Sequence, residues 1–203
     1  MAGLLTDTDA ERDIPTIDDV RDAARRIAGV AVRTPILHAH ALDEMAGGRV
    51  LVKAEPLQRT GSFKFRGAYN RLSLIAPGDR AAGVIACSSG NHAQGVAEAA
   101  RLLGMPATIV MPFDAPAIKR SRTLRSGATI VDYDRATQDR DTVTLALARE
   151  LGATLVHPYD DAGVIAGQGT VGLEIAEYCI DAGIQPDVVV VPAGGGGLAA
   201  GTG

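Results

Sequence analysis

The sequence has 203 residues, of which 46% are hydrophobic and 3% aromatic, and its formal net charge at pH 7 is -4. A chain of this length and composition can bury a sizeable hydrophobic core, which excludes disorder over most of its length. The charges are mixed and scattered, which argues against a basic face for nucleic acid or a polybasic tract for a membrane. We therefore expect a globular protein with a small-molecule partner, no nucleic acid and no membrane.

The first residues resemble no targeting signal. They lack a basic start and an apolar stretch long enough for secretion, and no later segment could span a bilayer. This predicts a cytoplasmic protein in which residues 1–14 form a flexible tail. Cys87 and Cys179 lie far apart without metal-ligand spacing, so we expect reduced thiols and predict no metal ligand.

A helix is predicted first, with Thr16 at its N-cap. Short β-rich runs then alternate with helical patterns, two of which end at Gly104 and Gly152, residues that suit a helix C-terminus. The alternation predicts an α/β protein with a parallel sheet and helices on both faces, where ligands collect at the carboxyl ends of strands. The predicted strands are residues 50–54, 83–87, 107–111, 128–132, 153–157 and 187–191.

The first motif that follows a strand is T-G-S-F-K-F-R-G, residues 60–67. It should begin a helix that continues to about Leu74, with Ser62 able to cap it and Lys64 in the first turn. There the helix dipole disfavours a cation, and apolar neighbours lower the pKa of an amine. A neutral amine can form a Schiff base with an aldehyde. The alternative is a lysine that extends into solvent at a helix end, and spacing alone leaves both interpretations open.

The second motif is C-S-S-G-N-H, residues 87–92, again between a strand and a helix. Free N–H groups at the start of that helix would suit a carboxylate. The alternative is ordinary capping by Ser89 or Asn91, with His92 as a satisfied polar residue.

The third motif is P-A-G-G-G-G-L-A-A-G, residues 192–201, directly after an apolar run. Four successive glycines suit a backbone that wraps closely around a phosphate. A tight contact between a helix and a sheet is one alternative. A dinucleotide-binding turn of the G-x-G-x-x-A type is another, but it gives no role to Lys64 or to the Asn91 loop.

In this order, G-S-F-K-F-R-G, S-S-G-N-H-A-Q-G and G-G-G-G-L-A-A-G resemble the fold-type II pyridoxal-phosphate enzymes. The similarity, from about Ile14 to the last residue, is to the serine/threonine ammonia-lyase (threonine dehydratase) and serine racemase branch. It implies a tryptophan synthase β-like fold of two open doubly wound sheets with helices on both faces. Residues 15–82 and 161–203 would form a large cofactor domain, and residues 83–160 a small substrate-closing domain.

The resemblance also implies roles for particular residues. Pyridoxal 5′-phosphate would be held by Lys64 as a Schiff base, next to Phe63, and Asn91 would hydrogen-bond its phenolic oxygen. Ser89 lies where the racemase carries the hydroxyl that faces Cα opposite the lysine, so Lys64 and Ser89 are the catalytic candidates. The substrate carboxylate would be bound by Ser88, Ser89, Gly90, Asn91 and His92. The phosphate would be bound by Gly194, Gly195, Gly196, Gly197 and Leu198.

The implied reaction is α,β-elimination on L-threonine or L-serine, giving a 2-oxo acid and ammonia. Phe65 after Lys64 and His92 after Asn91 favour elimination over the substitution typical of cysteine synthase-like relatives. The run Y-D-R-A-T-Q-D-R, residues 133–140, is similar to family members that act on threo-3-hydroxyaspartate. Because this run lies outside the motifs that contact the substrate, serine and threonine lead, with hydroxyaspartate ammonia-lyase and serine racemase as alternatives.

Members of this family continue beyond the point where this sequence stops, so we expect a fragment of a larger enzyme. The remainder would carry the partner of the pyridine nitrogen, the metal-site carboxylates of many relatives and further strands of the large sheet. The rival from another class is a binding module that performs no chemistry. The full-length form is expected to be a homo-oligomer.

Overall fold

The computed structural model of the chain describes residues 14–203, so residues 1–13 of the predicted tail lie outside the described residues. The helices are α1 (Ile17–Ile27), α2 (His40–Ala46), α3 (Lys64–Ser73), α4 (Asn91–Leu103), α5 (Ala117–Arg125), α6 (Arg140–Leu151), α7 (Ala162–Asp181) and α8 (Gly197–Thr202). The strands are β1 (Ile36–His38), β2 (Leu51–Lys53), β3 (Val84–Cys87), β4 (Ala107–Pro112), β5 (Thr129–Tyr133) and β6 (Thr154–Leu155). Short 3-10 helices lie at Glu55–Leu57 and Pro77–Ala82.

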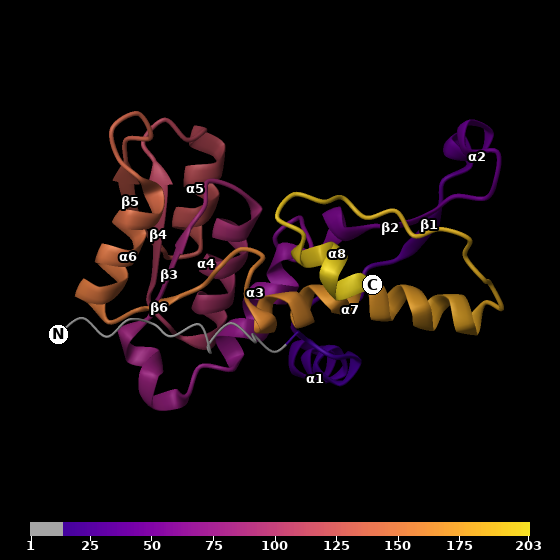
Figure 1. Ribbon diagram of the computed structural model, residues 1–203, viewed down its shortest axis with the longest axis horizontal. Coiled ribbons are helices and arrows are strands. Elements are labelled where there is room, and N and C mark those ends of the chain that lie inside the picture. The colour runs from indigo at the N-terminus through magenta and orange to yellow at the C-terminus, as the bar shows by residue number, and fades with distance from the viewer. Residues whose placement is uncertain (1–13) are drawn as a thin grey trace.

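A four-stranded parallel sheet with the order β5-β4-β3-β6 forms one lobe of the molecule. Figure 1 shows α6 on one side of this sheet and α4 and α5 on the other. Since both faces are covered, the central strands are rich in apolar residues, and Val84, Ile85 and Ala86 of β3 are all buried. The α/β fold class expected from the sequence is therefore confirmed.

Helix ends follow the sequence signals. Thr16 caps α1 through a capping box with Asp19, as predicted for its N-terminus. Gly104 and Gly152 end α4 and α6 in the left-handed conformation, with φ of 67° and 63°. Among residues 14–203, no helix combines the length and apolar character needed to cross a membrane.

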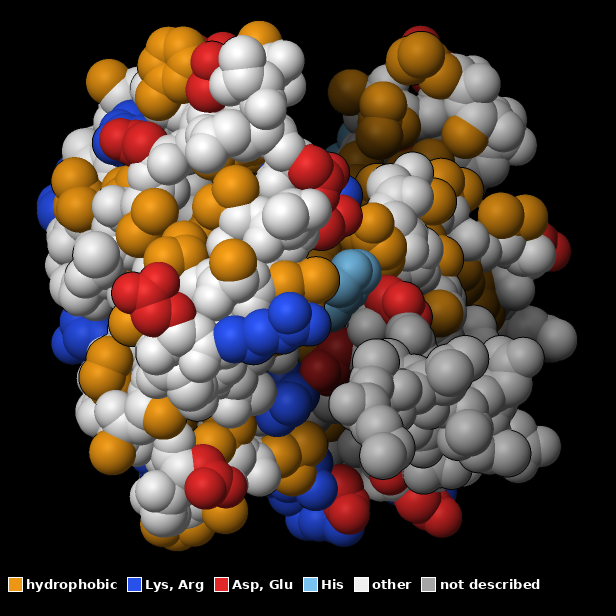
Figure 2. All heavy atoms as spheres, turned by 60° about the vertical axis from the view of Figure 1, so that its left-hand side comes forward, with side chains coloured by type: hydrophobic (Ala, Val, Ile, Leu, Met, Phe, Trp, Pro, Cys, Tyr) orange, Lys and Arg blue, Asp and Glu red, His pale blue; other side chains and the backbone are white. Residues whose placement is uncertain are grey.

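Helix α3 connects the two lobes, because it packs against α4 on one side and α7 on the other. Two glycines allow α3 and α7 to cross closely: a Cβ at Gly67 would lie 2.6 Å from the Val164 carbonyl oxygen, and one at Gly167 would lie 2.7 Å from the Arg66 carbonyl oxygen. Any larger side chain at these positions would force the helices apart. The start of α3 is thereby held at the junction of the lobes, where a groove separates them in the space-filling view (Figure 2).

The second sheet differs from the expectation. Among the described residues it contains β1 and β2, which pair antiparallel with Ile36 opposite Lys53, and the short strand β1 was not predicted. The prediction of a strand at residues 187–191 is wrong, since this segment is irregular and Val190 is 89% exposed. A strand needs a neighbour to satisfy its backbone N–H and C=O groups, and this segment pairs with no strand among residues 14–203.

Candidate active site

Lys64 is the first residue of α3. Its ammonium donates a hydrogen bond of 2.5 Å to the carbonyl oxygen of Pro158, and its Nζ lies 5.3 Å from the centre of the Phe63 ring. Burial lowers the pKa of the Lys64 amine below its ordinary value. Ser62 does not cap this helix as predicted: Phe63 occupies the N-cap without a side-chain bond. The first-turn N–H groups of α3 thus receive no side-chain cap from these residues.

The sequence contains three lysines, and their surroundings differ. Lys53 donates to the carbonyl oxygen of Thr34 at 2.5 Å and forms a buried ion pair with Glu174. Lys119 is exposed on α5. Lys64 is half-buried, bonded to a neutral carbonyl and lowered in pKa, so it is the lysine best suited to react as a neutral amine.

The Ser88–His92 turn lies beside Lys64 because α4 packs on α3. A Cβ on Gly95, one turn into α4, would lie 3.2 Å from the carbonyl carbon of Lys64. Gly90 is the N-cap of α4, so the side-chain capping by Ser89 or Asn91 that the sequence allowed is not formed. The N–H groups that open α4 therefore remain available to an anion.

His92 is buried and uncharged. Its Nε2 donates to the carbonyl oxygen of Val156 at 3.0 Å, and burial is the main cause that lowers the pKa of His92 to about 4. Its Nδ1 is buried without a hydrogen-bond partner among the described residues. A neutral imidazole with a free acceptor can therefore orient a donor, but it cannot supply a positive charge at neutral pH.

The glycine loop, residues 194–197, lies against Tyr159, next to the Pro158 carbonyl group that Lys64 contacts. A Cβ on Gly195 would overlap the Tyr159 ring, and one on Gly197 would lie 2.9 Å from the Tyr159 carbonyl oxygen and 3.1 Å from Oε1 of Gln168. Gly196 has φ of 86°, a conformation that glycine adopts without strain. Tyr159 follows Pro158, the partner of Lys64, so this short segment joins the lysine to the glycine loop.

Several side chains carry buried polar atoms that have no hydrogen-bond partner among the described residues. They are Oγ1 of Thr60, Oγ of Ser62, Nδ1 of His92, both amide atoms of Gln168, and Oγ1 of Thr202. Buried polar atoms normally form hydrogen bonds, so the unpaired ones at His92, near Lys64, and at Gln168, beside Gly197, point to a polar ligand. The close glycine cradle, the amine and these donors and acceptors fit a phosphorylated aldehyde.

Two adjoining hollows open at the carboxyl end of β3. One, of about 170 Å³, is lined by Cys87, Ser88, Ser89, Pro112, Tyr133, Arg135 and Arg140. The other, of about 210 Å³, shares Cys87 and Arg140 with the first and extends to His157 and Pro158. The run at residues 133–140 therefore lies beside Ser88 and Ser89, although the sequence separated it from the motifs assigned to the substrate.

Arg66 lies two residues after Lys64 in α3, and the sequence alone suggested no role for it. It is fully buried, bonded to Glu55 at 2.8 and 2.9 Å and to Glu174 at 2.7 and 3.0 Å. Burial raises the pKa of Glu174, but hydrogen bonds from Arg66 and Lys53 outweigh this and lower it, so the carboxylate stays ionised. The only sequence signal was an arginine inside the lysine motif. Pro158, Tyr159 and Gln168 gave no signal, because their partners are distant in sequence.

The protein has a parallel α/β fold in which an amine and a glycine loop come together. Such an arrangement is typical of enzymes that bind a small ligand near the ends of the strands. Residues 27–203 match the family described as pyridoxal-phosphate dependent enzyme, and the chain belongs to this family. It is 53% identical over 184 residues to an L-threo-3-hydroxyaspartate ammonia-lyase from Pseudomonas sp, covering 91% of this chain and 56% of that protein. It is 46% identical over 186 residues to an L-threonine ammonia-lyase from Thermotoga maritima, covering 92% and 45%.

Solved structures agree with this assignment. The maize serine racemase superposes with a TM-score of 0.87 at 39% identity, over 93% of this chain and 56% of that one. A threonine deaminase from T.th. gives 0.86 at 47% identity, over 93% and 59%. The chain thus spans about half the length of the relatives it matches. The family and branch predicted from the sequence are confirmed.

Proposed function

We propose that this protein catalyses the pyridoxal-phosphate-dependent α,β-elimination of water from a β-hydroxy amino acid, giving a 2-oxo acid and ammonia. The observation that carries the proposal is the placement of Lys64: a half-buried amine with a lowered pKa, beside the Ser88–His92 turn and joined to the glycine loop through Pro158 and Tyr159. The names of the relatives support the reaction class.

Lys64 would hold the cofactor's aldehyde covalently, next to Phe63, and Asn91 would contact its ring oxygen. The backbone of Gly194–Gly197 and Leu198 would hold the phosphate, in a cradle that side chains at Gly195 or Gly197 would fill. When bound, pyridoxal phosphate withdraws electron density from the substrate's Cα.

The residues of the chain would then act on the substrate. The N–H groups of the Ser88–His92 turn would bind its carboxylate at the start of α4. The neutral amine of Lys64, freed from the cofactor, would take the Cα proton as a base. Ser89 would be the second acid or base; if it returned a proton to the opposite face of Cα, the product would be the racemised amino acid.

A second candidate substrate is threo-3-hydroxyaspartate, and a specific observation favours it. Arg135, Arg140 and Tyr133 line the hollow that also contains Ser88 and Ser89. Arg135 already pairs with Asp114 at 2.8 Å and Arg140 contacts Asp141 at 3.3 Å, both near the surface. A substrate with a second carboxylate could bond either guanidinium, whereas the side chains of serine and threonine carry no charge to match it.

We further propose how the protein is divided into domains, how it assembles and where it acts. Residues 83–160 would close over the substrate on a cofactor domain of residues 15–82 and 161–203. The full-length protein would be a homo-oligomer in the cytoplasm, which light scattering and fractionation would measure.

The test is a 2-oxo acid assay of the protein loaded with pyridoxal phosphate, with L-serine, L-threonine and L-threo-3-hydroxyaspartate offered separately. Product that is lost in Lys64→Ala supports the elimination, and Arg140→Gln should reduce the reaction of hydroxyaspartate at least tenfold more than that of threonine. D-serine formed from L-serine without 2-oxo acid would identify the racemase. Cofactor binding without turnover of any substrate would identify a binding module and contradict the proposal.

A further inference from the structure

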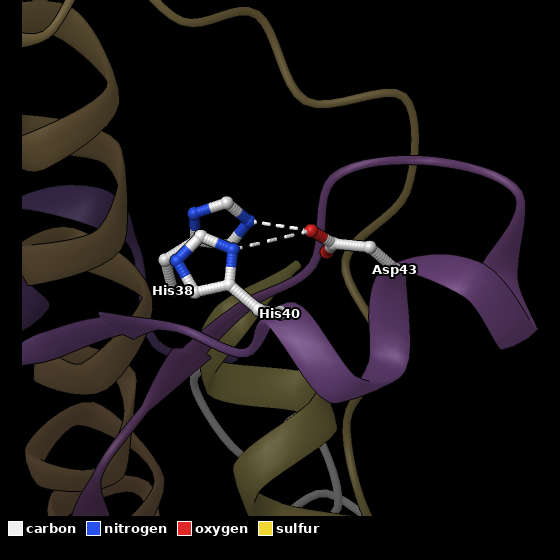
Figure 3. Close-up of side chains that lie close together, drawn as sticks. All are labelled: His38, His40 and Asp43. Carbon is white, nitrogen blue, oxygen red and sulfur yellow. Dashed lines mark hydrogen bonds and ion pairs between the residues drawn. The ribbon is translucent and has the colours of Figure 1, made fainter.

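Two histidines and an aspartate meet at the start of α2, remote from the site described above. His38 ends β1, His40 opens α2, and Asp43 lies one helical turn later. Nε2 of His38 is 2.7 Å from Oδ2 of Asp43, and Nδ1 of His40 is 3.8 Å from the same oxygen. Figure 3 shows both rings directed at this one carboxylate.

The backbone fixes the carboxylate in place. Oδ1 of Asp43 accepts a hydrogen bond of 2.8 Å from the N–H of Val50, on the far side of the α2 loop. The main-chain oxygen of Asp43 also accepts from the N–H groups of Gly47 and Gly48. Oδ2 is thereby left facing the two imidazoles, as metal ligands are usually oriented by a second hydrogen bond.

A hydrogen bond between His38 and Asp43 does not by itself account for His40. The His40 side chain is 80% exposed, yet its ring lies 3.7 Å from that of His38 between centroids and points at an oxygen that His38 already occupies. Among the described residues, α2 has no buried member, so packing in a hydrophobic core does not explain the direction of the His40 ring. A cation bound by all three groups would account for the convergence of both rings.

We propose that His38, His40 and Asp43 bind a divalent transition metal ion, with zinc as the ion that suits their chemistry. Imidazole nitrogen and carboxylate oxygen are ordinary zinc ligands, and water would complete a tetrahedral set. Ligand atoms at zinc distances in a tetrahedron are about 3.3 Å apart. The 2.7 and 3.8 Å separations lie on either side of that value, and all three donor atoms lie within 4.8 Å of one another. The ion would replace the proton between His38 and Asp43 and tie α2 to β1.

The test is calorimetric titration of the metal-free 203-residue chain with Zn²⁺. One ion per chain should bind, and His38→Gln and His40→Gln should each weaken binding at least about tenfold, as loss of metal-site groups does. His157→Gln is the matched control and should bind like the wild type. Wild-type chain without saturable binding, or His38→Gln and His40→Gln variants that bind as it does, would overturn the proposal.

A second readout needs no variant. Co²⁺ added to the wild-type chain should give the strong visible absorption of a tetrahedral nitrogen and oxygen site, and the weak spectrum of octahedral aqua ion alone would contradict the assignment. Because neither measurement involves pyridoxal phosphate, either result leaves the proposed elimination to its own assay.

Discussion

The ammonium of Lys64 donates a hydrogen bond to the carbonyl oxygen of Pro158, 94 residues further along the chain. This contact joins the start of α3 to the segment after β6, which in turn touches the glycine loop through Tyr159. Three regions that are separate in the sequence therefore lie close together in the fold.

Reductive trapping should modify Lys64 alone. Pyridoxal phosphate followed by borohydride should leave a stable adduct on the Lys64 peptide, located by mass spectrometry, since burial lowers the pKa of this amine. Lys64→Ala should lose the adduct and Lys119→Ala should keep it. An adduct found mainly on Lys53 or Lys119 would show that this explanation of Lys64 is wrong.

His92 should make the chain less stable in mild acid. Its pKa is lowered to about 4 in the folded state, so between that value and its ordinary pKa the unfolded chain binds more protons. Acidification from pH 7 to pH 5 should therefore cost roughly 2 kcal/mol of unfolding free energy through this group. Urea unfolding should show this loss in the wild type, and a smaller one in His92→Gln. If the unfolding free energy fell equally with pH in the two proteins, His92 would not be the cause.

Arg66 should be essential for folding stability rather than for chemistry. Arg66→Met leaves Glu55 and Glu174 buried without their main partner, which should cost roughly 3–5 kcal/mol in denaturant unfolding. The exposed Arg122→Met on α5 is the control and should change stability by less than about 0.5 kcal/mol. A similarly small effect at Arg66 would mean that the buried cluster contributes little.

Gln168 should have opposite effects with and without cofactor. Its amide lies buried between Gly67 and Gly197 with no hydrogen-bond partner among residues 14–203, so Gln168→Leu should leave the cofactor-free chain as stable or up to about 3 kcal/mol more stable. The same change should weaken loading with pyridoxal phosphate, measured by absorption titration. Unchanged loading would remove Gln168 from the site.

Elements with local signals could be predicted from the sequence alone. The cap at Thr16, the glycine ends of α4 and α6, and the four parallel strands follow from hydrogen-bonding side chains, backbone freedom and apolar runs within a few residues. The order of the three motifs also identified the family, because a lysine and a glycine loop at those places suit the binding of an aldehyde and a phosphate.

Features that depend on partners distant in the chain could be seen only in the folded protein. Residues 187–191 have the composition of a strand but pair with no neighbouring strand among the described residues. Ser62 is of a residue type that caps helices, but Phe63 occupies the N-cap position of α3. Arg140 and Ser88 line the same hollow because β3 packs in parallel with its neighbouring strands. Lys64 forms its hydrogen bond with Pro158 because α3 crosses α4. Local sequence sets which conformations a segment prefers, but long-range hydrogen bonds and packing select among them.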